Sequence, residues 1–243
     1  FRREFPACLD DAFHFTTSTY FHGDDLKKIT PIWFETAERR YEDATDNDAY
    51  VMGVDVSAGV NLDYSVITVV SLASLQVVYQ YRTNTVPPVM FSEKVADIGW
   101  EYNNALILCE SNNHGHVVLT RLRDFKYKNL WLDAKGKDWT TTVKSKLDAF
   151  ETLREFIVAE IIESLDMTTI MELRSLMIQK VTPEAPKGLH DDMAMSLALA
   201  YRCTRDVPRR VLRRAQENMV DEFIRHRRVG RRQSNPIPWE RKS

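Results

Sequence analysis

Buried strands and amphipathic helices alternate in the pattern of apolar and polar positions along the chain. The continuous apolar run at residues 50–56 predicts a strand that is buried on both faces. Residues 65–72 and 76–83 are rich in strand-forming residues, and because few residues separate them we expect antiparallel neighbours. Residues 105–110 predict a second buried strand.

Helical periodicity marks the segments between and after these strands. Residues 89–103 and 147–161 carry apolar side chains three and four positions apart, which predicts amphipathic helices. Residues 115–122 form a further candidate helix. Residues 191–202 are strong helix formers and are apolar nearly all round, so we expect this helix to be buried against the sheet.

Three segments have weaker patterns. Residues 1–48 lack sustained periodicity and indicate a connector with one short helix near residues 32–41. Residues 129–141 contain two tryptophans around a central Lys-Gly-Lys and predict a surface hairpin. Residues 170–182 fit either a short helix or a strand.

The order of these elements predicts the fold class. Three strands, a helix, a strand and further helices indicate an α/β fold with a central mixed β-sheet flanked by helices. The chain has 243 residues, of which 44% are hydrophobic, enough to bury one main core. No apolar run approaches the roughly 20 residues that cross a bilayer, so we expect a soluble intracellular protein without membrane contact.

Cysteine content and charge add two constraints. Cys8, Cys109 and Cys203 are an odd number at wide spacing, which favours a reducing compartment over a disulfide framework. The net charge is −2, but residues 202–243 hold 13 Lys/Arg against five Asp/Glu. This basic tail fits either contact with phosphates or a solvated helix that leads into a disordered end.

Acidic residues stand at the ends of the predicted buried elements. Asp55 lies near the end of the first strand, Glu110 closes the strand at residues 105–110, and Asp191 and Asp192 open the most apolar helix. A carboxylate taken out of water without a partner costs several kcal/mol, so such residues are normally paired, protonated or bound to metal. The sequence offers few basic neighbours for them.

Hard divalent cations accept oxygen ligands, so this pattern indicates a Mg²⁺ or Mn²⁺ site. Two such ions can catalyse in-line displacement at a phosphodiester. Each acid alone also fits a turn former, and Asp191 fits a helix cap. From the spacing alone, an actin-like nucleotide-binding fold or an inactive relative stays open.

Four stretches carry motifs around these acids. In chain order they are Val54-Asp55-Val56-Ser57-Ala58-Gly59 with Asp63-Tyr64-Ser65; Cys109-Glu110-Ser111-Asn112-Asn113-His114-Gly115; Thr140-Thr141-Thr142-Val143-Lys144-Ser145-Lys146; and Gly188-Leu189-His190-Asp191-Asp192-Met193-Ala194-Met195-Ser196-Leu197-Ala198. Together they resemble the C-terminal nuclease domain of tailed-bacteriophage terminase large subunits, which has an RNase H-like fold. The His-Asp-Asp stretch followed by an apolar helix is the most specific of the four.

The resemblance implies the site residues. Asp55 would bridge two metal ions, Glu110 would bind one ion, and Asp191 or Asp192 would bind the other. Asp63 is a weaker metal candidate, since a turn between strands explains it equally well. His190 either orients a ligand or caps the helix.

The resemblance also implies a function and partners. The implied activity is cleavage of concatemeric double-stranded viral DNA, and the implied partners are a portal protein and a small terminase subunit. The implied location is the host bacterial cytoplasm, at the procapsid portal. No GxxxxGK[ST] phosphate loop occurs, so we expect the ATPase domain to precede this segment. Residues 1–48 would then be the linker from that domain, residues 49–205 the nuclease domain, and residues 206–243 the basic tail.

Two alternatives remain from the sequence. One keeps the RNase H-like fold but changes the task to that of a junction resolvase or transposase-type nuclease. The other is a non-catalytic docking module for the portal or the small terminase subunit.

Overall fold

A five-stranded sheet forms the centre of the computed structural model, which describes residues 19–59, 63–179, 181–208 and 211. β3 pairs parallel with β6, and the other neighbours pair antiparallel, so the sheet is mixed. In spatial order the strands are β2 (Glu38–Arg40), β5 (Val77–Thr83), β4 (Ser65–Ser71), β3 (Tyr50–Asp55) and β6 (Leu106–Cys109).

The strands predicted from apolar runs are confirmed. β3 is buried along nearly its whole length and β4 along all of it, as expected for strands covered on both faces. β4 and β5 are the antiparallel neighbours that their short separation predicted. The mixed sheet flanked by helices is therefore the fold class that the element order indicated.

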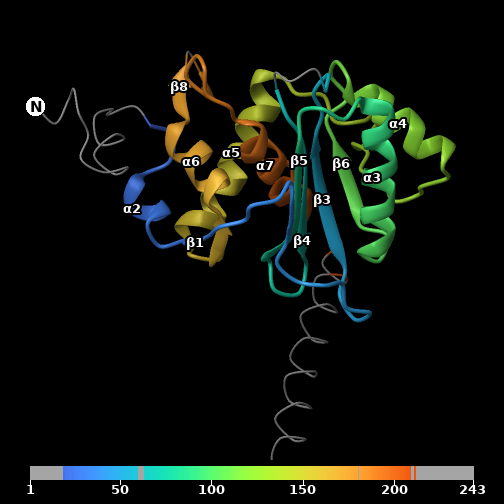
Figure 1. The fold of residues 1–243 in the computed structure, drawn as a ribbon, viewed down its shortest axis with the longest axis horizontal. Helices are drawn as coiled ribbons and strands as arrows, with labels where there is room; N and C mark the ends of the chain where they lie inside the picture. Colours follow the sequence, from blue (N-terminus) through green and yellow to red (C-terminus); the bar gives the residue numbers. More distant parts are fainter. Residues whose placement is uncertain (1–18, 60–62, 180, 209–210, 212–243) are drawn as a thin grey trace, which may run out of the picture.

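Helices cover both faces of the sheet (Figure 1). Their bounds are α3 (Pro88–Glu101), α4 (Gly115–Asp124), α5 (Val143–Val158), α6 (Met167–Ser175) and α7 (Asp192–Thr204). One buried cluster contains residues of α3 and α4, and another contains residues of α5, α6 and α7. Each amphipathic helix buries its apolar stripe against one of these clusters.

α7 lies directly against β3 and β4, and a glycine makes this approach possible. A Cβ atom on Gly53 would lie 2.2 Å from the carbonyl oxygen of Ser196 and 2.4 Å from the amide nitrogen of Ala200. The Ser196 hydroxyl donates a hydrogen bond of 3.0 Å to the Gly53 carbonyl and lies 2.9 Å from the Thr68 hydroxyl. Tight packing and a buried polar contact therefore fix the helix on the sheet.

Residues 19–48 contribute to the fold instead of forming only a connector. The helix predicted near residues 32–41 is wrong, because β2 occupies this region and pairs with β5. Arg39 of β2 is buried and its Nε atom lies 3.1 Å from Asp166 Oδ1. A buried charge needs such a partner, and the extended backbone of β2 also satisfies the open edge of β5.

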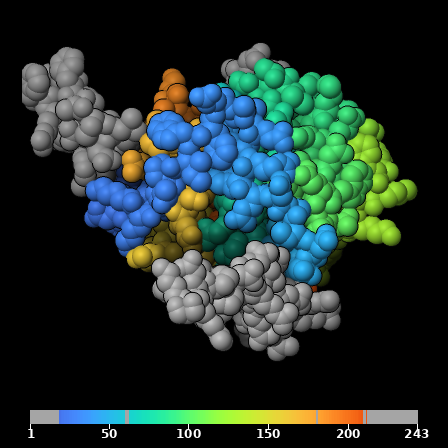
Figure 2. All heavy atoms as spheres, turned by 60° about the horizontal axis from the view of Figure 1, so that its bottom comes forward, coloured from blue at the N-terminus to red at the C-terminus, as the bar shows by residue number. Residues whose placement is uncertain are grey.

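Short elements complete this side of the molecule. They are α2 (Gly23–Leu26), β1 (Thr30–Ile32), β7 (Ser164–Asp166), β8 (Met177–Gln179) and β9 (Thr182–Glu184). β1 pairs parallel with β7, so Figure 2 shows the N-terminal segment, in blue, next to the gold segment. β8 and β9 form a separate antiparallel pair.

The structure decides two sequence interpretations in the second half of the chain. Residues 129–141 form a loop instead of a strand hairpin, and Trp131 packs on Trp139 with ring centroids 5.4 Å apart. Residues 170–182 hold both of the alternatives, since α6 ends at Ser175 and β8 follows it. Among the described helices, none is long and apolar enough to span a membrane.

Some predictions concern residues that the structure does not describe. Cys8 and the basic tail at residues 209–210 and 212–243 lie outside the described residues. The other two cysteines, Cys109 and Cys203, are buried free thiols.

Replacing Gly53 with alanine should destabilise the protein, because the added methyl group forces α7 away from β3. Overpacking a core costs about 1–3 kcal/mol or more, and we expect the free energy of unfolding in urea to fall by that amount. Gly23→Ala is the control, since nothing lies within 4 Å of a Cβ atom there. Wild-type stability of the Gly53→Ala variant would contradict the close packing described.

Candidate metal centre

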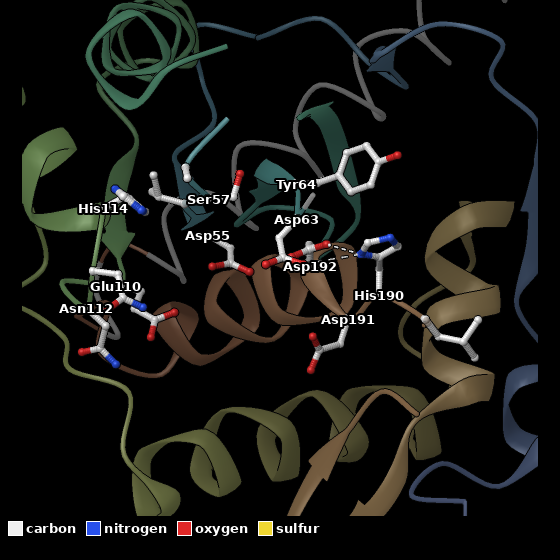
Figure 3. A pocket seen from close by; sticks show the side chains of 14 residues that line it. Asp55, Ser57, Asp63, Tyr64, Glu110, Asn112, His114, His190, Asp191 and Asp192 are labelled. Carbon is white, nitrogen blue, oxygen red and sulfur yellow. Dashed lines mark ion pairs between the residues drawn. The ribbon is translucent and has the colours of Figure 1, made fainter. Parts of the chain in front are cut away.

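A cavity of about 390 Å³ opens where β3, β6 and α7 meet. All five acidic residues that the sequence singled out line it, namely Asp55, Asp63, Glu110, Asp191 and Asp192. Figure 3 shows Asp55, Glu110 and Asp192 pointing toward the same space. The structure therefore brings together side chains that are far apart in the sequence.

The parallel pairing of β3 and β6 places the first two acids side by side. Val54 is in register with Cys109, and the Glu110 amide donates a hydrogen bond of 3.2 Å to the Val54 carbonyl. Asp55 ends β3 and Glu110 follows β6 directly. The carboxyl ends of parallel strands meet at one edge of a sheet, so both carboxylates face the same cavity.

The start of α7 supplies the other two acids, and their environments differ. Asp192 is buried, and its Oδ2 atom has no hydrogen-bond partner among the residues that the structure describes. Asp191 is half-buried, and its Oδ2 atom lies 3.2 Å from Lys146 Nζ on α5. A buried carboxylate oxygen without a hydrogen bond is costly, so Asp192 is the acid of this pair that most needs a cation.

Burial and mutual repulsion disfavour the ionised forms of these acids. The pKa of Asp55 lies well above its usual range because of burial and the neighbouring charges of Glu110, Asp192 and Asp191. Burial also raises the pKa of Glu110, against hydrogen bonds from Thr141 and Asn112 and the charge of Lys146.

The pKa of Asp192 is raised to about 6, first by burial. A backbone hydrogen bond from Tyr64 and the charge of His190 oppose this rise, whereas Asp191 and Asp63 add to it. Three neighbouring carboxyl groups thus all have raised pKa values. A divalent cation among them would offset both the cost of burying the ionised carboxylates and the repulsion between them.

His190 and Asp63 lie at the outer part of the cavity. His190 Nδ1 is 3.4 Å from Asp192 Oδ2 and 3.9 Å from Asp63 Oδ1. The Tyr64 ring meets the His190 ring edge-on at 5.2 Å. The Asp63 side chain is 76% exposed, which fits an outer position better than an inner ligand.

Helix capping does not explain the acids of α7. Asp191 is the N-cap residue by position but makes no side-chain cap hydrogen bond. Glu172 on α6 instead accepts hydrogen bonds from the amides of Met193 and Ala194. Sequence reasoning missed Glu172, because only the packing of α6 on α7 brings it there.

The cavity suits a hard divalent cation by its donor chemistry. The candidate ligands are carboxylate oxygens. Mg²⁺ needs only one or two carboxylates, because water and phosphate complete its coordination shell. Within the described part of the chain, no three His, Cys, Asp or Glu side chains are already arranged to hold one ion. The acids therefore line one cavity without forming a finished coordination shell.

Comparison with known proteins identifies relatives. The sequence model of a family described as the Terminase RNaseH-like domain matches residues 52–202. Large terminase nuclease structures from the thermophilic phage G20c, with bound cobalt and with bound magnesium, each align with a TM-score of 0.65 and 22% identity, covering 76% of this chain and 97% of that chain. The Thermus phage P74-26 large terminase nuclease domain aligns with a TM-score of 0.61 and 22% identity, over 73% of this chain and 92% of its own. At this identity the structural likeness shows a shared fold.

Replacing Asp192 with asparagine should stabilise the protein in EDTA at pH 7.5. The pKa of this carboxyl is raised from 3.8 to about 6. Relative to the ionised form, the protonated carboxyl therefore favours the folded state fully below pH 3.8, and this contribution is lost as the pH rises through 6. At pH 7.5 the ionised group costs on the order of 2–3 kcal/mol, which asparagine removes.

We expect a higher midpoint of thermal unfolding for Asp192→Asn than for wild type at pH 7.5, and a smaller difference at pH 4. Asp124→Asn, at an exposed acid on α4, is the control. Equal midpoints for Asp192→Asn and wild type at both pH values would show that Asp192 carries no such penalty.

Proposed function

The chain belongs to the family of terminase RNase H-like domains, and on this premise we propose that it is a metal-dependent endonuclease that cuts double-stranded viral DNA. The convergence of Asp55, Glu110 and Asp192 from three elements on one cavity carries this proposal. The aligned structures from phages G20c and P74-26 are large terminase nucleases, and two of the G20c structures hold cobalt or magnesium.

Asp55, Glu110 and Asp192 are the residues that would hold two Mg²⁺ or Mn²⁺ ions. Asp55 lies between the other two in Figure 3, and burial together with the charges of both raises its pKa, so it would share the ions with either of them. When bound, such ions activate water and stabilise the leaving oxygen in phosphodiester hydrolysis. The protein itself supplies fixed carboxylates on two strands and a helix, which keeps the ligands in place.

Asp192, rather than Asp191, is the primary acid of α7 in this proposal. The buried Oδ2 atom of Asp192 lies 3.4 Å from His190 Nδ1 but accepts no hydrogen bond from the described residues, whereas Lys146 already pairs with Asp191. Lys146 also lowers the pKa of Glu110 and so lies near both carboxylates. Asp191 would assist from the side, and Asp63 with its exposed side chain would act at an outer position.

We further propose the setting that the family suggests. The substrate is concatemeric viral DNA, and the partners are the ATPase domain of the full-length terminase, the portal protein and the small terminase subunit. Residues 1–48 then lead from the ATPase domain, with residues 19–48 also packing on the nuclease domain that residues 49–205 form, and residues 206–243 are the basic tail. The site of action is the procapsid portal in the host bacterial cytoplasm.

Cleavage of supercoiled plasmid tests the nuclease directly. We expect nicking and linearisation with Mg²⁺ or Mn²⁺ but not with EDTA, and a loss of roughly 100-fold or more in rate for Asp55→Asn, since a metal ligand contributes several kcal/mol to such a reaction. Asp124→Asn on α4 is the control and should retain wild-type rates. Preferred cutting of branched junctions would favour a junction resolvase, and no cutting by folded wild type with either metal would favour a docking module.

The same assay ranks the two acids of α7. Asp192→Asn should match the loss in Asp55→Asn, whereas Asp191→Asn should lose less, because Lys146 already pairs with Asp191. Comparison of initial rates at saturating Mn²⁺ measures the difference. A larger loss in Asp191→Asn than in Asp192→Asn would reverse the assignment.

A further inference from the structure

The beginning of α7 is capped by a side chain from another helix. Glu172 lies on α6 and is buried, and its Oε2 atom accepts hydrogen bonds from the amides of Met193 at 2.7 Å and Ala194 at 3.1 Å. These amides belong to the first turn of α7, where N–H groups have no partner within the helix. Glu172 therefore takes the place that an N-cap side chain usually fills.

This cap from α6 leaves the acids of α7 available to the cavity. A carboxylate that caps its own helix points at the N–H groups of the first turn. Asp191 stands at the N-cap position but makes no such hydrogen bond, and both it and Asp192 line the cavity. Glu172 itself does not line it.

Glu172 is also connected, through Arg82, to Tyr64, which lines the cavity. Its Oε1 atom lies 3.4 Å from Nη2 of Arg82, whose guanidinium carbon is 3.5 Å from the centroid of the Tyr64 ring. Tyr64 packs edge-on against His190 and gives Asp192 a backbone hydrogen bond. Two series of contacts therefore link Glu172 to Asp192. One passes through the backbone of α7, and the other passes through Arg82 and Tyr64.

The cap depends on an acceptor oxygen at the right distance. Burial raises the pKa of Glu172 to about 7, although Arg82 and the two amides favour the charged form. Glutamine has the same reach and keeps one acceptor oxygen, whereas alanine leaves both amides without a partner in the protein.

We propose that Glu172 is a positioning residue of the metal site, which holds the first turn of α7 so that Asp191 and Asp192 face the ions. This inference rests on the proposed function, because it assumes that divalent ions bind in the cavity. Glu172 acts through the backbone of Met193 and Ala194, without contact with the ions.

Two measurements on the 243-residue protein test the proposal. Mn²⁺ titration by calorimetry should show affinity lowered by about tenfold or more in Glu172→Ala, the loss typical of residues that orient metal ligands, and by less than about threefold in Glu172→Gln. Hydrogen exchange should become faster at the amides of Met193 and Ala194 in Glu172→Ala alone. If Glu172→Ala does not fold, Glu172→Asp replaces it, because its shorter side chain keeps the charge but withdraws the acceptor.

Asp166 provides a matched control. It is also buried, caps α6 by accepting a hydrogen bond of 3.0 Å from the Thr168 amide, and pairs with Arg39 at 3.1 Å. It does not line the cavity. Asp166→Ala should therefore lower the midpoint of thermal unfolding without changing the Mn²⁺ affinity of the folded protein.

The outcomes separate this proposal from the proposed function. Mn²⁺ binding that is absent in wild type, or that survives in Asp192→Asn, would overturn the metal site itself. Wild-type binding that Asp192→Asn abolishes and folded Glu172→Ala retains in full would overturn only the role of Glu172. An equal loss of affinity in Asp166→Ala would do the same, because general destabilisation would then explain both.

Discussion

Keeping several carboxylates together away from water is the constraint on which this structure depends. Burial is the largest cause of the raised pKa values of Asp55, Glu110 and Asp192, and mutual repulsion adds to the rise for Asp55. Such a cluster opposes folding unless the rest of the molecule holds its members in place. Strands and a helix that are buried almost completely provide this support, since their apolar burial outweighs the local penalty.

Three attachments fix the geometry of the cluster. The register of β3 with β6 sets Asp55 beside Glu110. Gly53 lets α7 approach β3 closely, and Glu172 secures the first turn of that helix. Each attachment acts on backbone atoms near an acid. The orientation of the acidic side chains is therefore set by tightly packed, rigid elements.

Local pattern was enough to predict most of the fold and to single out the acids that line one cavity. Apolar runs and helical periodicity located β3, β4, β5, α3 and α7, and acids at the ends of buried elements marked the cavity. β2 escaped prediction because its strand pairing and the burial of Arg39 depend on partners distant in sequence. The different environments of Asp191 and Asp192 also depend on distant partners, since Lys146 reaches Asp191, and Glu172 reaches the amides of Met193 and Ala194, only in the folded chain.

The spacing of the acids also sets the order in which the site can be completed during synthesis on the ribosome. Asp55 and Glu110 leave the ribosome well before Asp192, which begins the last of the helices described above. Until α7 docks on β3, a growing chain places only Asp55 and Glu110 at the cavity, and Asp192 is not yet beside them. The cavity is thus finished only when nearly all of the core has been made, so a chain that is cut short before α7 cannot assemble this group of acids.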